Sequence, residues 1–228
     1  MKINSIAIVM PVYNEQDNIR KVLKDWLRKI KLFNFKKFKF IIINDGSTDS
    51  TLENIKKVNS KYFKIINTKN KGHGNACLTG YKFALKNNYE WVFQIDSDGQ
   101  CNPRYFSSFV KKSKKNSVIY GYRFKRNDGY LRLVFTKILS IMIFLKTSHY
   151  VKDSNVPYRL IKASYLELVV KKIPKKLILK NILITIRLKK FFNNISYVPI
   201  IFNKRISGVT KYNFTTLLAQ LKNLMFYI

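Results

Sequence analysis

Acidic residues, glycine, proline and cysteine are all scarce in this chain of 228 residues. With 8 Gly and 5 Pro, the composition excludes collagen-like and low-complexity sequence. The two cysteines, Cys77 and Cys101, have no partner at metal-ligand spacing, so we expect reduced thiols rather than a disulfide or a zinc site. No apolar run reaches the roughly 18 residues of a membrane span, and the first one breaks at Pro11, too early for a signal peptide.

The shortage of acids leaves a formal net charge of +32, from 44 Lys and Arg against 12 Asp and Glu. Such an excess favours an anionic partner: nucleic acid, a membrane surface or a phosphorylated substrate. Lysine, asparagine and isoleucine are all abundant, and drift in an AT-rich genome gives the same composition. Charge alone therefore assigns no function. At 46% hydrophobic residues, the chain has enough apolar material for one domain over 1–228.

The first half of the chain alternates short apolar runs with helical patterns. We predict strands at residues 6–10, 38–43, 63–66 and 91–95. We predict helices at 16–30 and 78–86, and between them a further helix that begins at a capping box formed by Ser50 and Glu53. Short all-apolar strands separated by helices predict an α/β fold with a mostly parallel central sheet and helices on both faces. Beyond about residue 122 we expect a strand at 117–122, helices near 131–145 and 175–190, a strand at 195–202 and a final helix at 214–228.

Several of the scarce acids follow predicted strands. They are Glu15, Asp45, Asp96 and Asp98. Ligands bind at the carboxyl ends of strands in open α/β sheets, so the loops 12–15, 44–48 and 96–100 form the candidate site. A divalent cation prefers oxygen ligands, which the Asp96-Ser97-Asp98 turn and Gln100 supply. Each acid also has a simpler interpretation, as a turn residue, a helix cap or a complement to a helix dipole.

The segment NKGHGNA (70–76) lacks the Gly-Lys-Ser/Thr ending of a P-loop, and no GxGxxG follows the first strand. His73, between two glycines, either approaches a ligand or is an ordinary loop residue. A nucleic-acid-binding protein is the remote alternative. Because no zinc-finger spacing, RRM aromatic signature or basic zipper is present, we expect no nucleic-acid partner.

Four segments together resemble the family-2 glycosyltransferases of the GT-A fold, which transfer sugars from nucleotide-diphosphate donors. They are VMPVYNE (9–15), INDGSTDST (43–51), NKGHGNA (70–76) and QIDSDGQCNP (94–103). Their order and spacing are those of the family, over about residues 5–125. The resemblance implies a nucleotide-sugar half at about 1–122 and an acceptor half, ending in an amphipathic helix, at about 123–228.

The resemblance also assigns roles in the first half. The positions that match the family's nucleotide-sugar-binding residues are Pro11, Tyr13, Glu15, Asp45, Asp96 and Ser97. Asp98 matches the second acid of the family's DXD motif and is expected to hold Mg²⁺ or Mn²⁺. Gln100 resembles the glutamine that serves the metal site in the branch that transfers sugars to polyprenyl or dolichyl phosphate.

The second half resembles the same branch at GYR (121–123), KDSNVPYRL (152–160) and YVPIIFNKRISGVTKYN (197–213). The implied catalytic residues are Asp153, Arg159 and Arg205, and those implied to bind acceptor or phosphate are Arg123 and Lys211. Cys101 stands where the branch frequently has His, Pro157-Tyr158 replaces Gly-Phe, and Thr210 replaces Ser.

The resemblance implies inverting transfer to a polyprenyl phosphate or a related cell-surface glycan, with a sugar hydroxyl as the alternative acceptor. A hydroxyl acceptor needs a base, for which Asp153 is the candidate. An ionised lipid phosphate needs none, and Asp153 would then orient Arg159 or lie near the metal. The basic, partly aromatic segments 131–145 and 215–228 could bind an anionic leaflet, or could simply be packed in the protein. We expect a cytoplasmic protein, peripheral at the cytoplasmic face of the membrane.

Overall fold

The computed structural model describes residues 3–126, 130–174, 176–192, 194–203 and 214–228. Seven strands form one sheet, in the order β3-β2-β1-β4-β6-β5-β7. Their bounds are β1 Ser5–Val12, β2 Lys37–Asp45, β3 Phe63–Thr68, β4 Trp91–Gln94, β5 Val118–Arg126, β6 Arg159–Lys162 and β7 Ser196–Phe202. β1 to β4 run parallel, as do β5 and β7, and β6 runs antiparallel to both of its neighbours. The predicted α/β fold with a mostly parallel sheet is confirmed.

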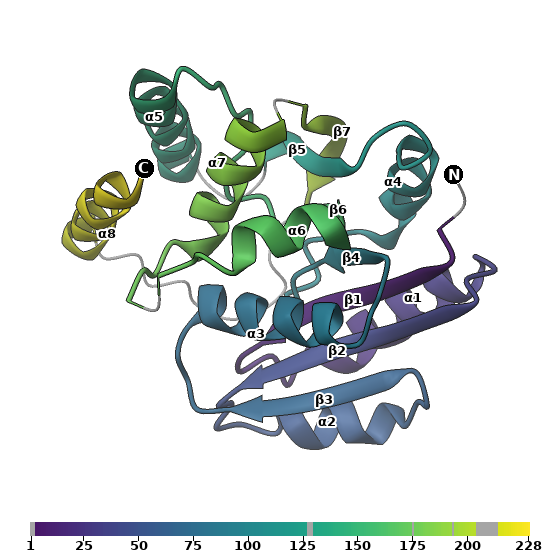
Figure 1. The fold of residues 1–228 in the computed structure, drawn as a ribbon. Coiled ribbons are helices and arrows are strands. Elements are labelled where there is room, and N and C mark those ends of the chain that lie inside the picture. Colours follow the sequence, from purple (N-terminus) through teal and green to yellow (C-terminus); the bar gives the residue numbers. More distant parts are fainter. Residues whose placement is uncertain (1–2, 127–129, 175, 193, 204–213) are drawn as a thin grey trace.

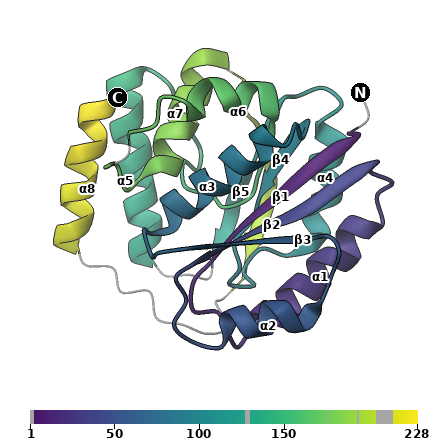
Figure 2. The ribbon, with the colours of Figure 1, turned by 60° about the horizontal axis from the view of Figure 1, so that its bottom comes forward.

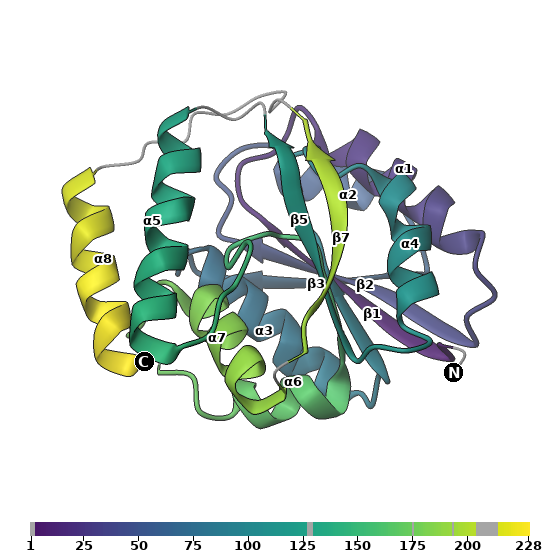
Figure 3. The ribbon, with the colours of Figure 1, turned by 90° about the horizontal axis from the view of Figure 1, so that it is seen from above.

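Helices cover both faces of the sheet (Figures 1 and 3). One face carries α1 Ile19–Lys31, α2 Thr51–Val58 and α4 Phe106–Lys112, which follows a short 3₁₀ turn, η1 Pro103–Tyr105. The other carries α3 His73–Lys86, α6 Ala163–Val170 and α7 Lys180–Phe192. Because β1 and the middle of β2, residues 40–43, are buried on both sides, both consist almost entirely of apolar residues.

Two further helices, α5 Tyr130–Thr147 and α8 Phe214–Tyr227, lie side by side beyond the layered part of the molecule (Figures 2 and 3). Lys146 on α5 donates through Nζ to the carbonyl of Met225 on α8, at 2.8 Å. None of the helices in the described part of the chain combines the length and the hydropathy needed to cross a bilayer.

Strand β1 continues through Pro11, past the predicted end at residue 10. The carbonyl of Val9 accepts from Ile95 N, so alternate residues of β1, including Pro11, direct their main-chain groups toward β4. β4 has already ended at Gln94, and the missing N–H of proline therefore costs no bond of the sheet.

Three local expectations were incomplete or wrong. Ser50 precedes α2, but its side chain makes no capping bond, and the Asp49 carboxylate accepts from Thr51 N at 3.0 Å instead. The predicted capping box is therefore wrong. The segment 70–76 is not entirely loop, since α3 already begins at His73. The sequence analysis also missed β6 together with α4 and α6.

Candidate active site at the carboxyl edge of the sheet

The order of the strands reverses at β1, which has β2 on one side and β4 on the other. The carboxyl ends of these three parallel strands therefore meet at one edge of the sheet, which is where open α/β sheets bind ligands. The loops after them are the three that the sequence singled out, and Glu15, Asp45, Asp96 and Asp98 all follow or end these strands. The predicted gathering of acids at this edge is thus supported by the topology.

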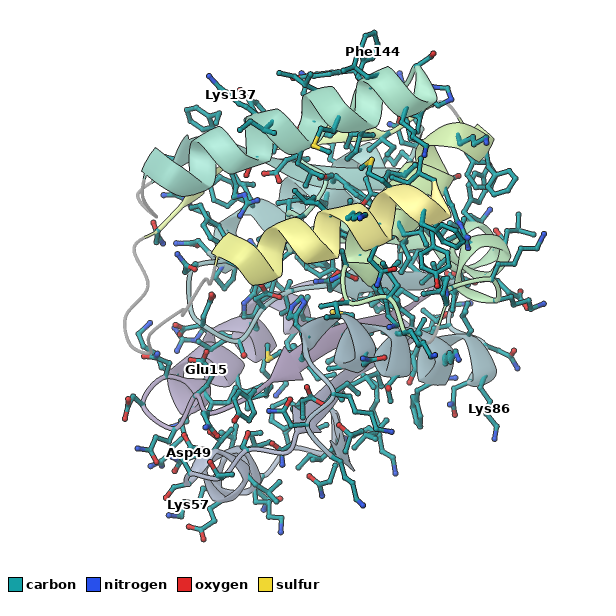
Figure 4. All side chains as sticks on the ribbon, turned by 90° about the vertical axis from the view of Figure 1, so that its left-hand side faces the viewer. Glu15, Asp49, Lys57, Lys86, Lys137 and Phe144 are labelled. Atoms are coloured by element: carbon teal, nitrogen blue, oxygen red, sulfur yellow. The ribbon has the colours of Figure 1, made fainter. Side chains whose placement is uncertain are left out.

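Hydrogen bonds join the loop after β1 to the loop after β2. Asn14, held in the left-handed region at φ 50°, accepts through Oδ1 from Thr48 N at 2.9 Å and donates from its own N–H to Ser47 Oγ at 3.1 Å. Glu15 is buried, and its N–H donates to Thr51 Oγ1 at 2.7 Å. Figure 4 shows Glu15 and Asp49 at the same edge of the molecule. The two loops form one rigid wall of the site.

Next to this wall, Pro11 is buried within β1, whereas Tyr13 just beyond the strand is 46% exposed. An exposed aromatic ring at this edge offers a surface on which a nucleobase can stack. Ser97, on the neighbouring loop, is buried.

Asp45 ends β2 and is almost fully buried. Its Oδ1 accepts from Thr68 Oγ1 at 3.0 Å and from Lys71 N at 3.1 Å. Gly46 is required beside it, because a Cβ there would lie 2.7 Å from Asn70 N and the backbone has φ +72°. Asp45 therefore fixes the segment that enters α3, a contact that the sequence did not indicate.

Asp96, directly after β4, faces the first residue of α3. Its Oδ1 lies 3.0 Å from Nε2 of His73, which is about half exposed. Partial burial disfavours a charged imidazole, but Cys77 and the Asp96 carboxylate raise the pKa of His73 well above its ordinary value of 6.5. Burial would raise the pKa of Asp96, yet the attraction of His73 lowers it below 3.8. The two side chains form a charge-assisted pair.

Asp98 and Gln100 were the predicted metal ligands. Asp98 is partly exposed at the carboxyl edge, and its Oδ1 accepts from Gln100 N at 3.0 Å. Within the described residues, no three His, Cys, Asp or Glu side chains come together as a ready-made metal cage. Mg²⁺ and Mn²⁺ are commonly held by one or two carboxylates with substrate phosphates completing the shell, and this turn fits such a site.

Gln100 has a second, structural partner. Its Nε2 donates to the carbonyl of Asn203, beyond the end of β7, at 2.7 Å, and the side chain is buried. The amide nitrogen thus fastens the Asp96–Asp98 turn to the segment that follows β7. Arg205 and Lys211, the predicted catalytic and phosphate-binding cations of that segment, lie outside the described residues.

Asp153 and Arg123 form a bidentate ion pair. Nε and Nη2 of Arg123 donate to Oδ2 and Oδ1 of Asp153 at 2.6 and 2.7 Å, and both side chains are buried. The expectation that Asp153 orients Arg159 is wrong, because the guanidinium that faces it belongs to Arg123.

Arg159, the first residue of β6, is completely buried. Its guanidinium donates to three main-chain carbonyls, those of Ser154, Val156 and Asn181, at 2.7 to 3.0 Å. It also lies over the ring of Tyr120 at 4.9 Å. This environment corrects the picture of Arg159 as a cation that faces a substrate phosphate: it holds the turn before β6 against the start of α7.

Sequence reasoning missed Asn181, a buried residue at the start of α7. Its Nδ2 lies 3.4 Å from Nδ1 of His73 and 3.4 Å from Sγ of Cys77, while its carbonyl accepts from Arg159 and from Thr185 Oγ1. No spacing in the sequence connects positions 73 and 181, and no sequence signal could have found this contact.

Comparison with known proteins identifies the family and the fold. Residues 7–167 match the family model described as glycosyl transferase family 2, well over half of the chain. The chain belongs to glycosyl transferase family 2. The matched region includes the acid-bearing loops and the Arg123–Asp153 pair, and it extends beyond the residues 5–125 on which the resemblance was first noticed.

Relatives of this glycosyl transferase include an uncharacterised protein of Methanocaldococcus jannaschii, 32% identical over 71% of this chain and 73% of its own length. The UDP-N-acetylglucosamine–dolichyl-phosphate N-acetylglucosaminyltransferase of Methanococcus voltae is 28% identical over 71% of each chain. The undecaprenyl-phosphate 4-deoxy-4-formamido-L-arabinose transferase of Proteus mirabilis is 25% identical, and the match spans 67% of this chain but only 47% of that protein.

Among solved structures, glucosyl-3-phosphoglycerate synthase of Mycobacterium tuberculosis, in complex with Mn²⁺, UDP-glucose and phosphoglyceric acid, superposes with a TM-score of 0.70. The superposition covers 97% of this chain and 77% of that one at 14% identity. Similarity at this level establishes the shared GT-A fold and nothing finer.

Proposed function

We propose that this glycosyl transferase moves a sugar, with inversion, from a nucleoside-diphosphate donor to a polyprenyl phosphate. The anomeric carbon exchanges its bond to the leaving diphosphate oxygen for a bond to an oxygen of the acceptor phosphate. The two relatives that act on undecaprenyl and dolichyl phosphate support this acceptor, and the donor-side loops are those expected for a nucleotide sugar.

The observation that carries the choice of acceptor is the Arg123–Asp153 pair. A hydroxyl acceptor needs a carboxylate that can take its proton, and Asp153 was the candidate. Its carboxylate instead accepts two bonds from Arg123 and is buried. The other carboxylate in the described part of the second half, Glu167 on α6, pairs with Lys171 at 2.8 Å. A phosphate is ionised at neutral pH and removes the need for such a base.

On the donor side, we assign Asp98 and the Oε1 atom of Gln100 to a Mg²⁺ or Mn²⁺ ion. When bound, the ion supplies Lewis-acid stabilisation of the charge that develops on the leaving diphosphate. Tyr13 stacks on the base, with Pro11 and Glu15 forming the wall beneath it. Asp45 and Asp96 accept from hydroxyl groups of the donor, and Ser97 lines the turn between Asp96 and Asp98.

On the acceptor side, we assign Arg123, Arg205 and Lys211 to the lipid phosphate. Arginine suits this task because its planar fork can bond two phosphate oxygens. Asp153 holds the Arg123 guanidinium in place, and Arg159 is a positioning residue that fixes the 154–159 turn. Of Arg123 and Arg159, this assignment gives only Arg123 a direct contact with the phosphate.

The lipid acceptor implies a membrane surface, and α5 with α8 is the part of the molecule that fits one. Four apolar side chains form an outward stripe on α5: Ile138, Ile141, Phe144 and Leu145, between 48% and 77% exposed. Lys137 borders the stripe, and Figure 4 shows Lys137 and Phe144 pointing away from the body of the protein. With a net charge of +32, this face suits an anionic leaflet, at which we place the protein on the cytoplasmic side.

Organic extraction tests the acceptor. Incubating the purified protein with membranes and labelled sugar nucleotides should move label into an organic-soluble lipid. Label that appears only in water-soluble glycan would instead establish a hydroxyl acceptor, and absence of nucleoside diphosphate release from every donor would reject the enzyme itself.

A further inference from the structure

His73 occupies a junction between the two halves of the molecule. It is the first residue of α3, and its two ring nitrogens face different elements: Nε2 lies 3.0 Å from Oδ1 of Asp96, after β4, and Nδ1 lies 3.4 Å from Nδ2 of Asn181, on α7. Asp96 is part of the donor site, whereas Asn181 belongs to the second half of the chain. The contact of Nε2 with Asp96 and the neighbouring Asn181 amide together restrict the orientations that this half-exposed imidazole can adopt.

Glycines on either side make this placement possible. Gly72 precedes α3 with φ 84°, a left-handed conformation that suits glycine. A Cβ on Gly74 would lie 2.6 Å from the carbonyl of Ile178, so the first turn of α3 touches the entry to α7 more closely than any larger residue allows. The close approach of these two helix starts is what brings Asn181 to the His73 ring.

The same Asn181 also holds Arg159. Its main-chain carbonyl accepts from Arg159 Nη1 at 2.9 Å, while its side chain faces His73. A continuous set of contacts therefore runs from Arg159 through Asn181 and His73 to Asp96. The Asp96 end has been assigned to the donor and the Arg159 end to the turn that follows Asp153.

We propose that His73 is a positioning residue that fixes the Asp96 carboxylate for donor binding, under the control of Asn181 on α7. By donating from Nε2 to Oδ1, the imidazole sets the rotation of the carboxylate and thus the direction in which its other oxygen meets a hydroxyl of the donor. This rests on the proposed function for its kinetic test, but the contact itself can be measured without any donor.

The kinetic test is a double-mutant cycle on the nucleotide sugar that gives the fastest release of nucleoside diphosphate. We expect His73→Ala to raise the donor KM about tenfold, the size of one lost charge-assisted hydrogen bond, with kcat within about twofold. His73→Gln, whose amide nitrogen replaces Nε2 as donor, should recover most of that loss. In an Asp96→Ala background, His73→Ala should change KM less than about twofold, because the group through which it acts is gone.

The matched control is His149→Ala, which removes the other histidine of the chain, in the loop after α5, and should leave the donor KM unchanged. An equal effect of His73→Ala with and without Asp96 would overturn the proposal. So would a loss of thermal stability that His73→Gln fails to correct, since that pattern marks a residue needed only for folding.

The second arm is NMR of ¹⁵N-histidine protein, with the His149→Ala variant assigning the His73 signals. We expect Nε2 to be protonated and hydrogen-bonded in the wild type, and Asp96→Ala and Asn181→Leu each to release the ring toward the averaged shifts of a free imidazole. Free-imidazole shifts in the wild type would reject the role of His73 even if the enzyme is active. If no donor is turned over but the bonded signals appear, the proposed function fails and the contact stands.

Discussion

The guanidinium of Arg123 and the carboxylate of Asp153 meet through two parallel hydrogen bonds of 2.6 and 2.7 Å in a largely buried position. The residues are 30 positions apart, one in the second half of β5 and the other in the loop before β6. The family resemblance implied a catalytic role for Asp153 and a phosphate-binding role for Arg123, but the sequence did not show that they bind each other. Because of this pairing, Asp153, the candidate general base, instead holds the guanidinium of Arg123 in place.

Removing one partner of the Arg123–Asp153 pair should destabilise the folded protein. Arg123→Ala leaves a buried carboxylate without its counter-charge, and we expect a loss of about 3–5 kcal/mol in the free energy of unfolding, measured in urea. Asp153→Asn should lose less, because the amide can still accept from Arg123. If Asp153→Asn instead abolishes turnover without changing the unfolding midpoint, Asp153 is a general base and the phosphate acceptor is wrong.

Arg159 supplies a second stability test. Arg159→Met should destabilise the protein by about 2–4 kcal/mol, because it removes three hydrogen bonds that the guanidinium donates to buried carbonyls. A variant that keeps wild-type stability and loses only affinity for the lipid phosphate would show that Arg159 contacts the substrate directly.

The metal assignment predicts that Asp98→Ala abolishes release of nucleoside diphosphate while thermal unfolding stays unchanged, and that a chelator does the same to the wild type until Mg²⁺ or Mn²⁺ is returned. Asp25→Ala is the matched control, since Asp25 lies on α1 and pairs with Lys21 at 2.6 Å. Full activity of Asp98→Ala would refute the assignment.

The burial of Lys180 should make the stability of the protein depend on pH. Lys180 is buried at the start of α7, where its charge also opposes the helix dipole, and burial lowers its pKa below 10.5. A base with a lowered folded pKa binds fewer protons when folded, so its contribution to stability rises with pH between that pKa and 10.5. The free energy of unfolding of the wild type should therefore increase relative to that of Lys180→Met as the pH rises through this window. A difference that stays constant with pH would contradict the lowered pKa.

Membrane docking predicts that the protein floats with anionic liposomes and that Ile141→Ser with Phe144→Ser on α5 abolishes this binding. Leu32→Ser is the control, because Leu32 is also an exposed apolar residue, 73% exposed, and directly follows α1 rather than lying on α5. Binding that persists at high salt on neutral liposomes would show that the +32 charge does not drive it.

The position of the acids at the carboxyl edge of the sheet could be predicted from the sequence because it depends on local features. Each acid lies within a few residues of the strand that carries it, so strand assignment places Asp45 and Asp98 at this edge. The partners of these acids could not be predicted in the same way. The contact of Asp96 with His73 and that of Arg159 with Asn181 join segments 23 and 22 residues apart, across different layers of the fold.

Strand β6 shows the same limit within the fold itself. Its four residues, Arg-Leu-Ile-Lys, are too few to give a periodic signal, and their strand conformation comes from pairing with β4 and β5 on either side. The Ser50–Glu53 pattern failed for the opposite reason. The local signal was present, but Asp49 one position earlier reached the first N–H of α2 instead.

The place of β6 in the middle of the sheet also has a consequence for biosynthesis. Strands β1 to β4 can assemble as soon as residue 94 has left the ribosome, but the outer edge of β4, Trp-Val-Phe-Gln, finds its partner only when β6 emerges about 65 residues later. At ~5–20 residues per second, this edge of β4 remains unpaired for roughly 3–13 seconds on the nascent chain. We therefore expect holdase chaperones to cross-link most strongly to nascent chains between these two lengths.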